Sequence, residues 1–270
     1  MEQSNAIQLI ADEQPRLSAE LRDLPADAWS ALSRCEGWSN ARTLAHLTLA
    51  SSFYHQSVTR ALNGDTSPPA APDGREMALE DLRQLFTNRQ EEWGRKPSAE
   101  LLDLFDEHGL ALVDLFRGLS PADLDKPAWH PFGTITIGTF VGFRTFELGF
   151  HGWDIRASLD PNAAVRAELR PFLLGMVRQA QARFCRPEPH LEGAFRCEVD
   201  GQAWAFRAGN GALADAPADT AADATIKTDA DSYLLLATSR RSLPELSGRV
   251  TIAGDRRQAE RFLSAACFGI

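Results

Sequence analysis

The segment FELGFHGWDI, residues 146–155, is mostly apolar and aromatic, yet it contains the carboxylates of Glu147 and Asp154 and the imidazole of His151. These three residues are separated by four and three positions, and such spacings bring side chains to one face of an α-helix. The helical pattern continues on both sides of the segment. We therefore predict a long helix over about residues 136–159.

The polar face of this helix is unusually narrow. Arg144 lies three positions before Glu147 and Ser158 lies four positions after Asp154, so both extend the same stripe. The positions around the stripe are apolar or aromatic: Phe140, Phe143, Phe146, Leu148, Phe150, Trp153 and Ile155. An ordinary surface helix has a broad polar face. We therefore expect this helix to be buried on most sides, with its polar stripe facing a bundle interior or a cleft, where charges must be paired or bound to a metal.

Glu147 and His151 could supply two of the three protein ligands of an open zinc site. The best candidate for the third is His46, in the segment ARTLAHLTLASSF, because its neighbours on the predicted helix are apolar. His55 lies nine positions further on and cannot share that helix face. A second interpretation stays open, in which Glu147 and His151 form only a buried hydrogen-bonded pair. In the metal interpretation, Asp154 would orient a ligand imidazole.

The first 160 or so residues are predicted to form a helical bundle. Ser39 is a suitable N-cap for one of its helices, and Asn63-Gly64 would end that helix. Four main helices and one long connection, residues 119–136, are typical of a four-helix bundle. Besides the helix already described, the sequence predicts three main helices over residues 4–24, 39–62 and 98–118 and a short helix over residues 78–93.

The pattern changes from about residue 190, where AFRCEVDGQAWAFRAG alternates around Asp200-Gly201, a strong hairpin signal. ATIKTD and GRVTIAGD are predicted strands, ADSYLLLATSR and RRQAERFLSAAC are predicted helices, and the Ala/Asp-rich GNGALADAPADTAADA is expected to be a surface loop. A helix over about 163–185 would join the two parts. We predict an α+β protein with a four-helix bundle over residues 1–162 and a small α/β domain over residues 163–270.

The composition excludes several classes of partner. The chain has 270 residues, of which 44% are hydrophobic and 24% charged, and its net charge of −9 argues against nucleic acid or an anionic membrane as the main partner. The start lacks the pattern of a signal peptide, and no apolar run has the length of a membrane span. We expect a cytoplasmic protein whose scattered cysteines are reduced: Cys35, Cys185, Cys197 and Cys267.

Two segments, GWSNARTLAHL and FELGFHGWDIRASL, together resemble the mycothiol-dependent maleylpyruvate isomerase family, whose N-terminal bundle belongs to a larger DinB-like metal-binding group. SYLLLATSRRSLPELSGRVTIAGDRRQAERFL is similar to the sterol-carrier-like domain that is often fused to these bundles, so the resemblance covers nearly the whole chain. It implies that His46, Glu147 and His151 bind the metal. These are the residues that the helical spacing also favours.

The resemblance also implies a chemistry. We expect the metal to be divalent, with Zn²⁺ as the first candidate. Two imidazoles and one carboxylate leave such a metal with a positive charge and an open position. A low-molecular-weight thiol similar to mycothiol would bind there as a thiolate and add to an electrophilic small molecule. The expected activity is that of a zinc-dependent thiol transferase or a cis–trans isomerase, in a monomer or a homodimer.

An acidic keto-acid substrate would also require basic side chains. Arg144 and Arg156 in the long helix, and Arg240 or Arg249 in the second half, are the candidates. Arg240 stands where the relatives carry a Gly-Arg pair, although this chain has Ser239 in place of the glycine. We assign the catalytic roles to three residues: Arg144, Asp154 and Arg240.

Two alternative functions remain open at this stage. The same bundle could hold a zinc ion that activates water, which would make the protein a metal-dependent hydrolase. The second half could instead make it a non-catalytic binder of an apolar small molecule. A fold does not by itself decide among these functions, because function depends on the site.

Overall fold

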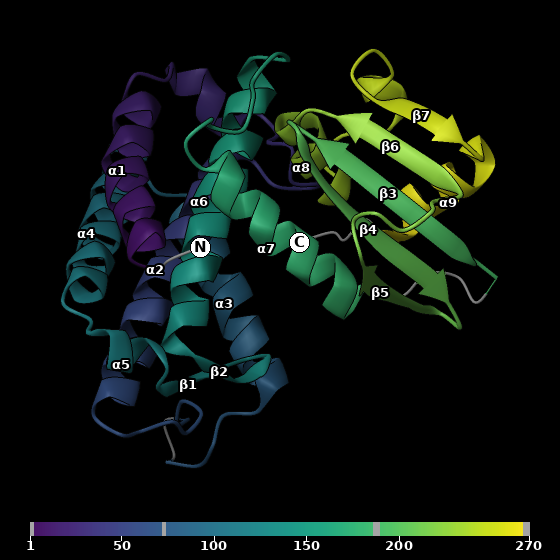
Figure 1. Ribbon diagram of the computed structural model, residues 1–270. Coiled ribbons are helices and arrows are strands. Elements are labelled where there is room, and N and C mark those ends of the chain that lie inside the picture. The colour runs from purple at the N-terminus through teal and green to yellow at the C-terminus, as the bar shows by residue number, and fades with distance from the viewer. Residues whose placement is uncertain (1–2, 72–73, 186–189, 267–270) are drawn as a thin grey trace. The chain divides into compact units, whose positions relative to one another are not determined.

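The computed structural model describes residues 3–71, 74–185 and 190–266 of the chain (Figure 1). It divides into two compact units, of which the first ends at Ala164 and the second begins at Val165. The first unit consists almost entirely of helices, whereas the second combines a β-sheet with helices. This is the α+β organisation that the sequence predicts.

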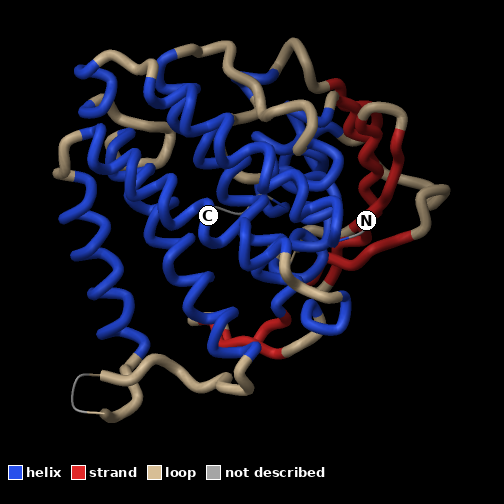
Figure 2. The backbone as a smooth tube through the Cα atoms, turned by 90° about the vertical axis from the view of Figure 1, so that its left-hand side faces the viewer, coloured by secondary structure: helices blue, strands red, loops and turns tan. Residues whose placement is uncertain are grey.

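Four long helices form the first unit. Helix α2 packs against α4 and α6, α1 packs against the same two helices, and the shorter α3 packs against α2. Figure 2 shows these helices running alongside one another, with a short β-hairpin at one end. The four long helices are α1 Gln3–Arg22, α2 Asn40–Leu62, α4 Ser98–Arg117 and α6 Ile137–Leu159. The shorter α3 covers Leu79–Gly94, and the 3₁₀ helix η1 covers Ala26–Ser30. The predicted four-helix bundle is confirmed.

The ends of the long helices follow the capping rules. Ser39 Oγ accepts a hydrogen bond of 3.2 Å from the backbone N–H of Arg42, so Ser39 is the N-cap of α2 as predicted. Gly64, just past the end of α2, has φ of +81°, a conformation that glycine adopts at little cost. Thr136 caps α6 in the same way as Ser39 caps α2.

Helix α6 is buried on most sides, as its sequence predicts. Phe140 and Trp153 on its apolar faces have no exposed surface, and neither do the charged residues Arg144 and Asp154 on its polar stripe. The bundle therefore encloses the polar stripe of α6 together with its aromatic residues. The buried charges must find partners inside the protein.

A fully buried glutamine on α1 connects three helices. The side chain of Gln14 donates a hydrogen bond of 3.1 Å to the carbonyl of Phe105 in α4. Its Oε1 atom accepts a hydrogen bond of 2.8 Å from Arg144 in α6. Gly109 makes room for this amide, since a Cβ atom at position 109 would lie 2.2 Å from Gln14 Nε2.

We predict that Gly109→Ala destabilises the protein, although alanine is favoured over glycine in a helix by about 0.5–1 kcal/mol. The added methyl group would displace Gln14 and break its hydrogen bonds, so we expect a net loss of about 1–3 kcal/mol in the free energy of unfolding, measured by urea denaturation. Gly118→Ala, at the end of the same helix, is the matched control, because its Cβ would make only ordinary contacts. A Gly109→Ala variant more stable than wild type would contradict this account.

The long connection between α4 and α6 is ordered. It contains a short helix, α5 (Pro121–Leu124), followed by a hairpin of β1 (Pro127–His130) and β2 (Gly133–Thr136) that leads directly into α6. Ser57 Oγ in α2 donates a hydrogen bond of 2.6 Å to the carbonyl of Trp129. This bond ties the hairpin to the bundle.

The second unit contains a five-stranded sheet with strand order β5-β4-β3-β6-β7. Strands β3 and β6 are parallel, and all other neighbours are antiparallel. The strands are β3 Gly193–Val199, β4 Gln202–Gly209, β5 Ala212–Ala216, β6 Ala224–Thr228 and β7 Thr251–Gly254. The helices are α7 Arg170–Phe184, α8 Ala230–Ala237 and α9 Arg256–Ala266, with the 3₁₀ helix η2 over Pro244–Leu246.

The predicted hairpin at Asp200-Gly201 is confirmed, because the two residues have φ of +47° and +80° between the paired strands β3 and β4. The expected surface loop in the Ala/Asp-rich stretch is wrong in part. A second tight turn at Asn210-Gly211 lets Ala212–Ala216 pair with β4. The sequence does not reveal this strand, because a strand that pairs with the edge of β4 through backbone hydrogen bonds needs no strong alternation of apolar and polar residues.

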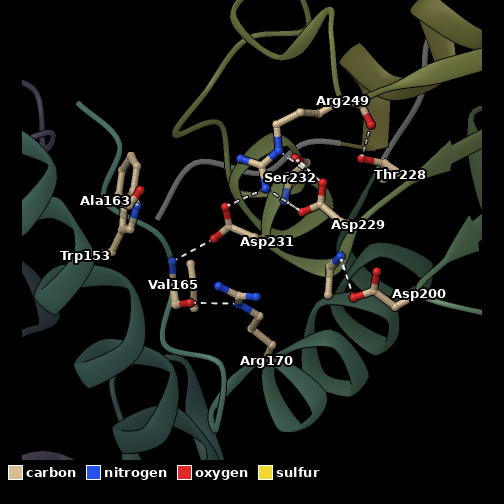
Figure 3. Close-up of polar contacts among 11 residues, drawn as sticks. Trp153, Ala163, Val165, Arg170, Asp200, Thr228, Asp229, Asp231, Ser232 and Arg249 are labelled. Carbon is tan, nitrogen blue, oxygen red and sulfur yellow. Dashed lines mark hydrogen bonds and ion pairs between the residues drawn. The ribbon is translucent and has the colours of Figure 1, made fainter. Parts of the chain in front are cut away.

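Helix α7 begins at Arg170, later than the predicted start near 163. The preceding segment has other hydrogen bonds (Figure 3): the Val165 N–H donates to Asp231 Oδ1 at 2.7 Å, and Arg170 Nε donates to the Val165 carbonyl at 2.8 Å. Pro171 follows at the first turn, a position that proline favours. The buried Asp231 therefore holds an irregular segment in place of the predicted first turns.

Within the described part of the chain, no helix combines the length and the apolar character that crossing a membrane requires. Among the described residues, Cys35, Cys185 and Cys197 form no disulfide with one another. Cys267 lies outside the described residues.

Candidate metal centre

Helices α2 and α6 bring His46, Glu147 and His151 together inside the first unit. His46 Nε2 lies 3.9 Å from Glu147 Oε1, and the ring centroids of His46 and His151 are 4.9 Å apart. Glu147 and His151 share a face because they are one helical turn apart, whereas His46 reaches them through the packing of α2 on α6.

The three side chains are enclosed to different degrees. The His46 side chain is 31% exposed, that of Glu147 14% and that of His151 6%. A small molecule can therefore approach the cluster on the side of His46. Burial, with smaller contributions from the positive charges of His151 and Arg144, lowers the pKa of His46. His46 is therefore neutral at pH 7, the state in which an imidazole binds a metal.

The Glu147 carboxylate is held by one oxygen only. Tyr54 in α2 donates a hydrogen bond of 2.8 Å to Oε1, whereas Oε2 is buried and has no hydrogen-bond partner among the described residues. Arg144 Nη1 is 3.7 Å from Oε2. Burial raises the pKa of Glu147, and the positive charge of Arg144 opposes this shift. The carboxylate thus presents Oε1 to His46 at 3.9 Å and keeps a second oxygen with unused hydrogen-bonding capacity, which fits a divalent cation beside two imidazoles.

The Nδ1 atom of the His151 ring contacts a fully buried carboxylate. His151 Nδ1 lies 3.0 Å from Asp154 Oδ2, one turn along α6. A carboxylate that accepts the Nδ1–H fixes the tautomer and leaves the Nε2 lone pair for a metal. The predicted role of Asp154 in orienting a ligand imidazole stays a prediction.

Cys35 also reaches this carboxylate, which the sequence analysis missed. Its Sγ donates to Asp154 Oδ2 at 3.1 Å and lies 3.4 Å from His151 Nδ1. The ligand atoms of Cys35, His151 and Asp154 lie within 4.8 Å of one another and could themselves hold a metal. In that set the side chains already satisfy one another by hydrogen bonds. One oxygen of Glu147 has no hydrogen-bond partner among the described residues. We therefore favour His46, Glu147 and His151 as the metal ligands over this second set.

Trp38 lies beside both histidines. Its ring centroid is 5.2 Å from that of His46 and 6.2 Å from that of His151. The loop that carries it is fixed by the Arg34 N–H, which donates 3.1 Å to the Asp154 carbonyl, and by the Ser33 N–H, which donates 2.9 Å to the Trp38 carbonyl. In the sequence, the only signal for this role was that Trp38 directly follows Gly37 and directly precedes the N-cap residue Ser39.

The predicted anion-binding arginines lie in other environments. Arg144 is fully buried and donates to the Leu47 carbonyl at 2.9 Å and to Gln14 at 2.8 Å, so it supports Glu147 from the interior and does not present an open anion site. Arg156 Nε donates to the Gly152 carbonyl of its own helix. Arg249 donates to both Asp229 and Asp231 (Figure 3).

Arg240 belongs to the second unit, and its proposed role stays a prediction. Its backbone N–H donates to the Leu235 carbonyl at 2.8 Å, just after the end of α8. Ser239 has φ of +58°, the left-handed conformation that glycine adopts most easily. Ser239 therefore makes this turn without a glycine.

We predict that Asp154→Asn weakens metal binding by about 10–100-fold, because an amide is a poorer acceptor for the His151 N–H. Competition with a chromophoric chelator measures the affinity, and circular dichroism verifies the fold. Asp160→Asn, at the exposed end of the same helix, is the control. Equal affinities for the two variants would show that Asp154 does not support the metal centre.

The chain is similar to known proteins in sequence and in fold. The family model described as mycothiol maleylpyruvate isomerase N-terminal domain matches residues 10–156. No curated protein matches the chain.

Among solved structures, the crystal structure of the mycothiol-dependent maleylpyruvate isomerase is 14% identical, with a TM-score of 0.66 over 94% of this chain and 93% of that chain. A mutant of that isomerase is 13% identical, with a TM-score of 0.65 and the same coverage. The ubiquinone synthesis protein UbiJ-SCP2 is 22% identical over 35% of this chain and 91% of that chain, with a TM-score of 0.28. At these identities the first two similarities establish the fold of both units.

Proposed function

The chain belongs to the mycothiol maleylpyruvate isomerase family, and from this premise we propose that it is a zinc-dependent enzyme that uses a low-molecular-weight thiol similar to mycothiol. The proposed reaction is the cis–trans isomerisation of an unsaturated keto acid such as maleylpyruvate. Thiol transfer would use the same centre if the thiol adduct were released as product.

The observation that carries this proposal is the convergence of His46, Glu147 and His151 inside the first unit, where one oxygen of the Glu147 carboxylate has no hydrogen-bond partner among the described residues. These three residues would hold the metal. Two nitrogen ligands and one oxygen ligand with an open position is a pattern of catalytic zinc sites. A bound zinc ion lowers the pKa of a thiol so that the thiolate is available at neutral pH.

The surrounding residues prepare the ligands. Tyr54 holds Oε1 of Glu147, the oxygen that lies 3.9 Å from His46 Nε2, and Arg144 offsets the negative charge of the carboxylate from the side of Oε2. Asp154 keeps the proton of His151 on Nδ1. Because all of these groups are buried, their interactions with the ligands are little screened by water.

Isomerisation requires a reversible addition. The thiolate sulfur forms a bond to one carbon of the cis double bond, and the electron pair of that bond moves onto the conjugated carbonyl oxygen. The former double bond is then a single bond and can rotate. Return of the electron pair expels the thiolate and restores the double bond in the trans form, so that no thiol is consumed.

We expect the purified protein to bind about one zinc per chain and to isomerise maleylpyruvate only when both zinc and mycothiol are present. His151→Ala should lose the metal and at least about 100-fold in activity while it remains helical, because a bundle with a large core does not need the metal to fold. The measurements are elemental analysis, circular dichroism and the absorbance of the keto acid.

His55→Ala is the matched control, since His55 lies on α2 but away from the cluster. Full activity after removal of zinc would refute the proposed role of the metal. Zinc-dependent activity that needs no thiol and consumes water would instead favour the hydrolase.

For Arg240 we propose a contact with an anionic substrate. Arg240→Gln should raise the KM for the keto acid by about tenfold or more, because a charge-assisted hydrogen bond contributes about 1.5–3 kcal/mol. The control is Arg257→Gln, on the exposed face of α9. Steady-state kinetics on zinc-loaded protein decide the point, and an unchanged KM would remove Arg240 from the site.

A further inference from the structure

A polar pocket of about 260 Å³ lies where the first turn of α2 meets the last turn of α3, and none of its lining residues is a proposed metal ligand. Ser39 and Arg42 line it from α2, and Glu91, Gly94 and Arg95 line it from the α3 side. The two helices touch closely here, since a Cβ atom at Gly94 would lie 3.2 Å from the Cα of Arg42. The pocket is thus part of the bundle packing and not a gap between loops.

Arg42 has hydrogen-bonding capacity that the protein does not use. Its Nε atom is buried and has no hydrogen-bond partner in the described ranges of the chain. Its guanidinium carbon lies 5.3 Å from the centroid of the Trp38 ring, so an aromatic face positions the group. Arg42 lines the pocket, so its guanidinium group offers charge-assisted hydrogen-bond donors to an anion bound there.

The charges around the pocket also favour an anion. Two guanidinium groups, those of Arg42 and Arg95, face one carboxylate, that of Glu91. Glu91 pairs with Arg95 at 3.4 Å, in successive turns of one helix. The N-terminus of α2, a helix of 23 residues, adds partial positive charge beside Ser39. The fork geometry of arginine matches a carboxylate with two parallel hydrogen bonds.

This pocket adjoins the candidate metal centre. Arg42 lies one helical turn before His46 on α2, and both are neighbours of Trp38. The Trp38 ring is also near the ring of His151, at 6.2 Å. A ligand that extends along Trp38 from the metal centre would therefore bring its far end to Arg42.

We propose that this pocket binds a carboxylate of the electrophilic substrate, with Arg42 as its main contact and Arg95 as a weaker one. The inference rests on the proposed function and deepens it, because it assigns residues of this chain to one carboxylate of a dicarboxylate such as maleylpyruvate. A cis-unsaturated keto acid of this class has a carboxylate at each end. Arg42 would then determine specificity for substrates with the second carboxylate.

The test uses steady-state kinetics of the full-length, zinc-loaded protein with maleylpyruvate and mycothiol. Arg42→Gln should raise the KM for maleylpyruvate by about tenfold or more, and should change kcat and the KM for mycothiol by less than about threefold. Arg42→Lys should recover part of the loss, because it keeps the charge without the fork. Arg89→Gln is the matched control on α3, where Arg89 is exposed and lies 3.7 Å from Glu92.

A binding measurement separates this inference from the proposed function. Maleate, an unreactive cis-dicarboxylate, should bind the zinc-loaded wild-type protein in calorimetry and should bind Arg42→Gln about tenfold more weakly. If the wild type binds maleate in this way but isomerises nothing, the proposed function fails and the pocket assignment stands. If the wild type isomerises maleylpyruvate and Arg42→Gln changes neither constant, the pocket assignment is overturned.

Two further outcomes are decisive. A rise in the KM for mycothiol alone would mean that the pocket holds the thiol, which overturns the inference. Should Arg42→Gln lose its helicity or its zinc, Arg42→Lys and Arg95→Gln replace it, with an expected rise of about threefold in the KM for maleylpyruvate. No rise in either variant would count against the pocket.

Discussion

The buried carboxylate of Glu147 is the constraint on which the first unit depends. A carboxylate removed from water must be compensated, and here Tyr54 and Arg144 supply the compensation. Arg144 is itself fully buried, so its own donors require the Leu47 carbonyl and Gln14. One charge on α6 therefore specifies polar partners on α1 and α2.

The requirement extends to the fourth helix. Gln14 satisfies its amide on the Phe105 carbonyl of α4, and Gly109 leaves the space for it. All four helices of the bundle thus contribute a backbone or side-chain group to one chain of contacts that ends at Glu147. A network of this kind is stabilising only when it is complete, because each unpaired buried member costs free energy. Among the described residues, this network leaves two buried atoms without a hydrogen-bond partner, Glu147 Oε2 and Arg144 Nε, on the two residues that form the ion pair of 3.7 Å.

The loop before α2 supplies a second layer around the same centre. It brings Cys35 to Asp154 and Trp38 to the two histidines, while Arg34 fastens its backbone to α6. The loop and the first turn of α2 also position Arg42 against Trp38. The metal ligands would then lie on two rigid helices. The substrate contacts would lie on the adjoining loop and on the first turn of α2.

The local features of this protein follow from its sequence alone. The helical spacing of Glu147, His151 and Asp154, the cap at Ser39 and the turn at Asp200-Gly201 all depend on residues within a few positions of one another. The apolar surroundings of the stripe were sufficient to predict that α6 is buried. For the same reason, His46 could be selected as an inward-facing histidine, because its neighbours on the predicted helix are apolar.

The contacts that complete the centre were decided only by the tertiary structure. Tyr54 and Glu147 are 93 positions apart, Cys35 and Asp154 are 119 apart, and Gln14 and Arg144 are 130 apart. No periodicity connects residues at such distances, so the sequence could not show that Arg144 supports Glu147 from the interior or that Arg42 keeps an unused donor. Both facts depend on which helix faces which, and that is determined by how the four helices pack around the buried charge.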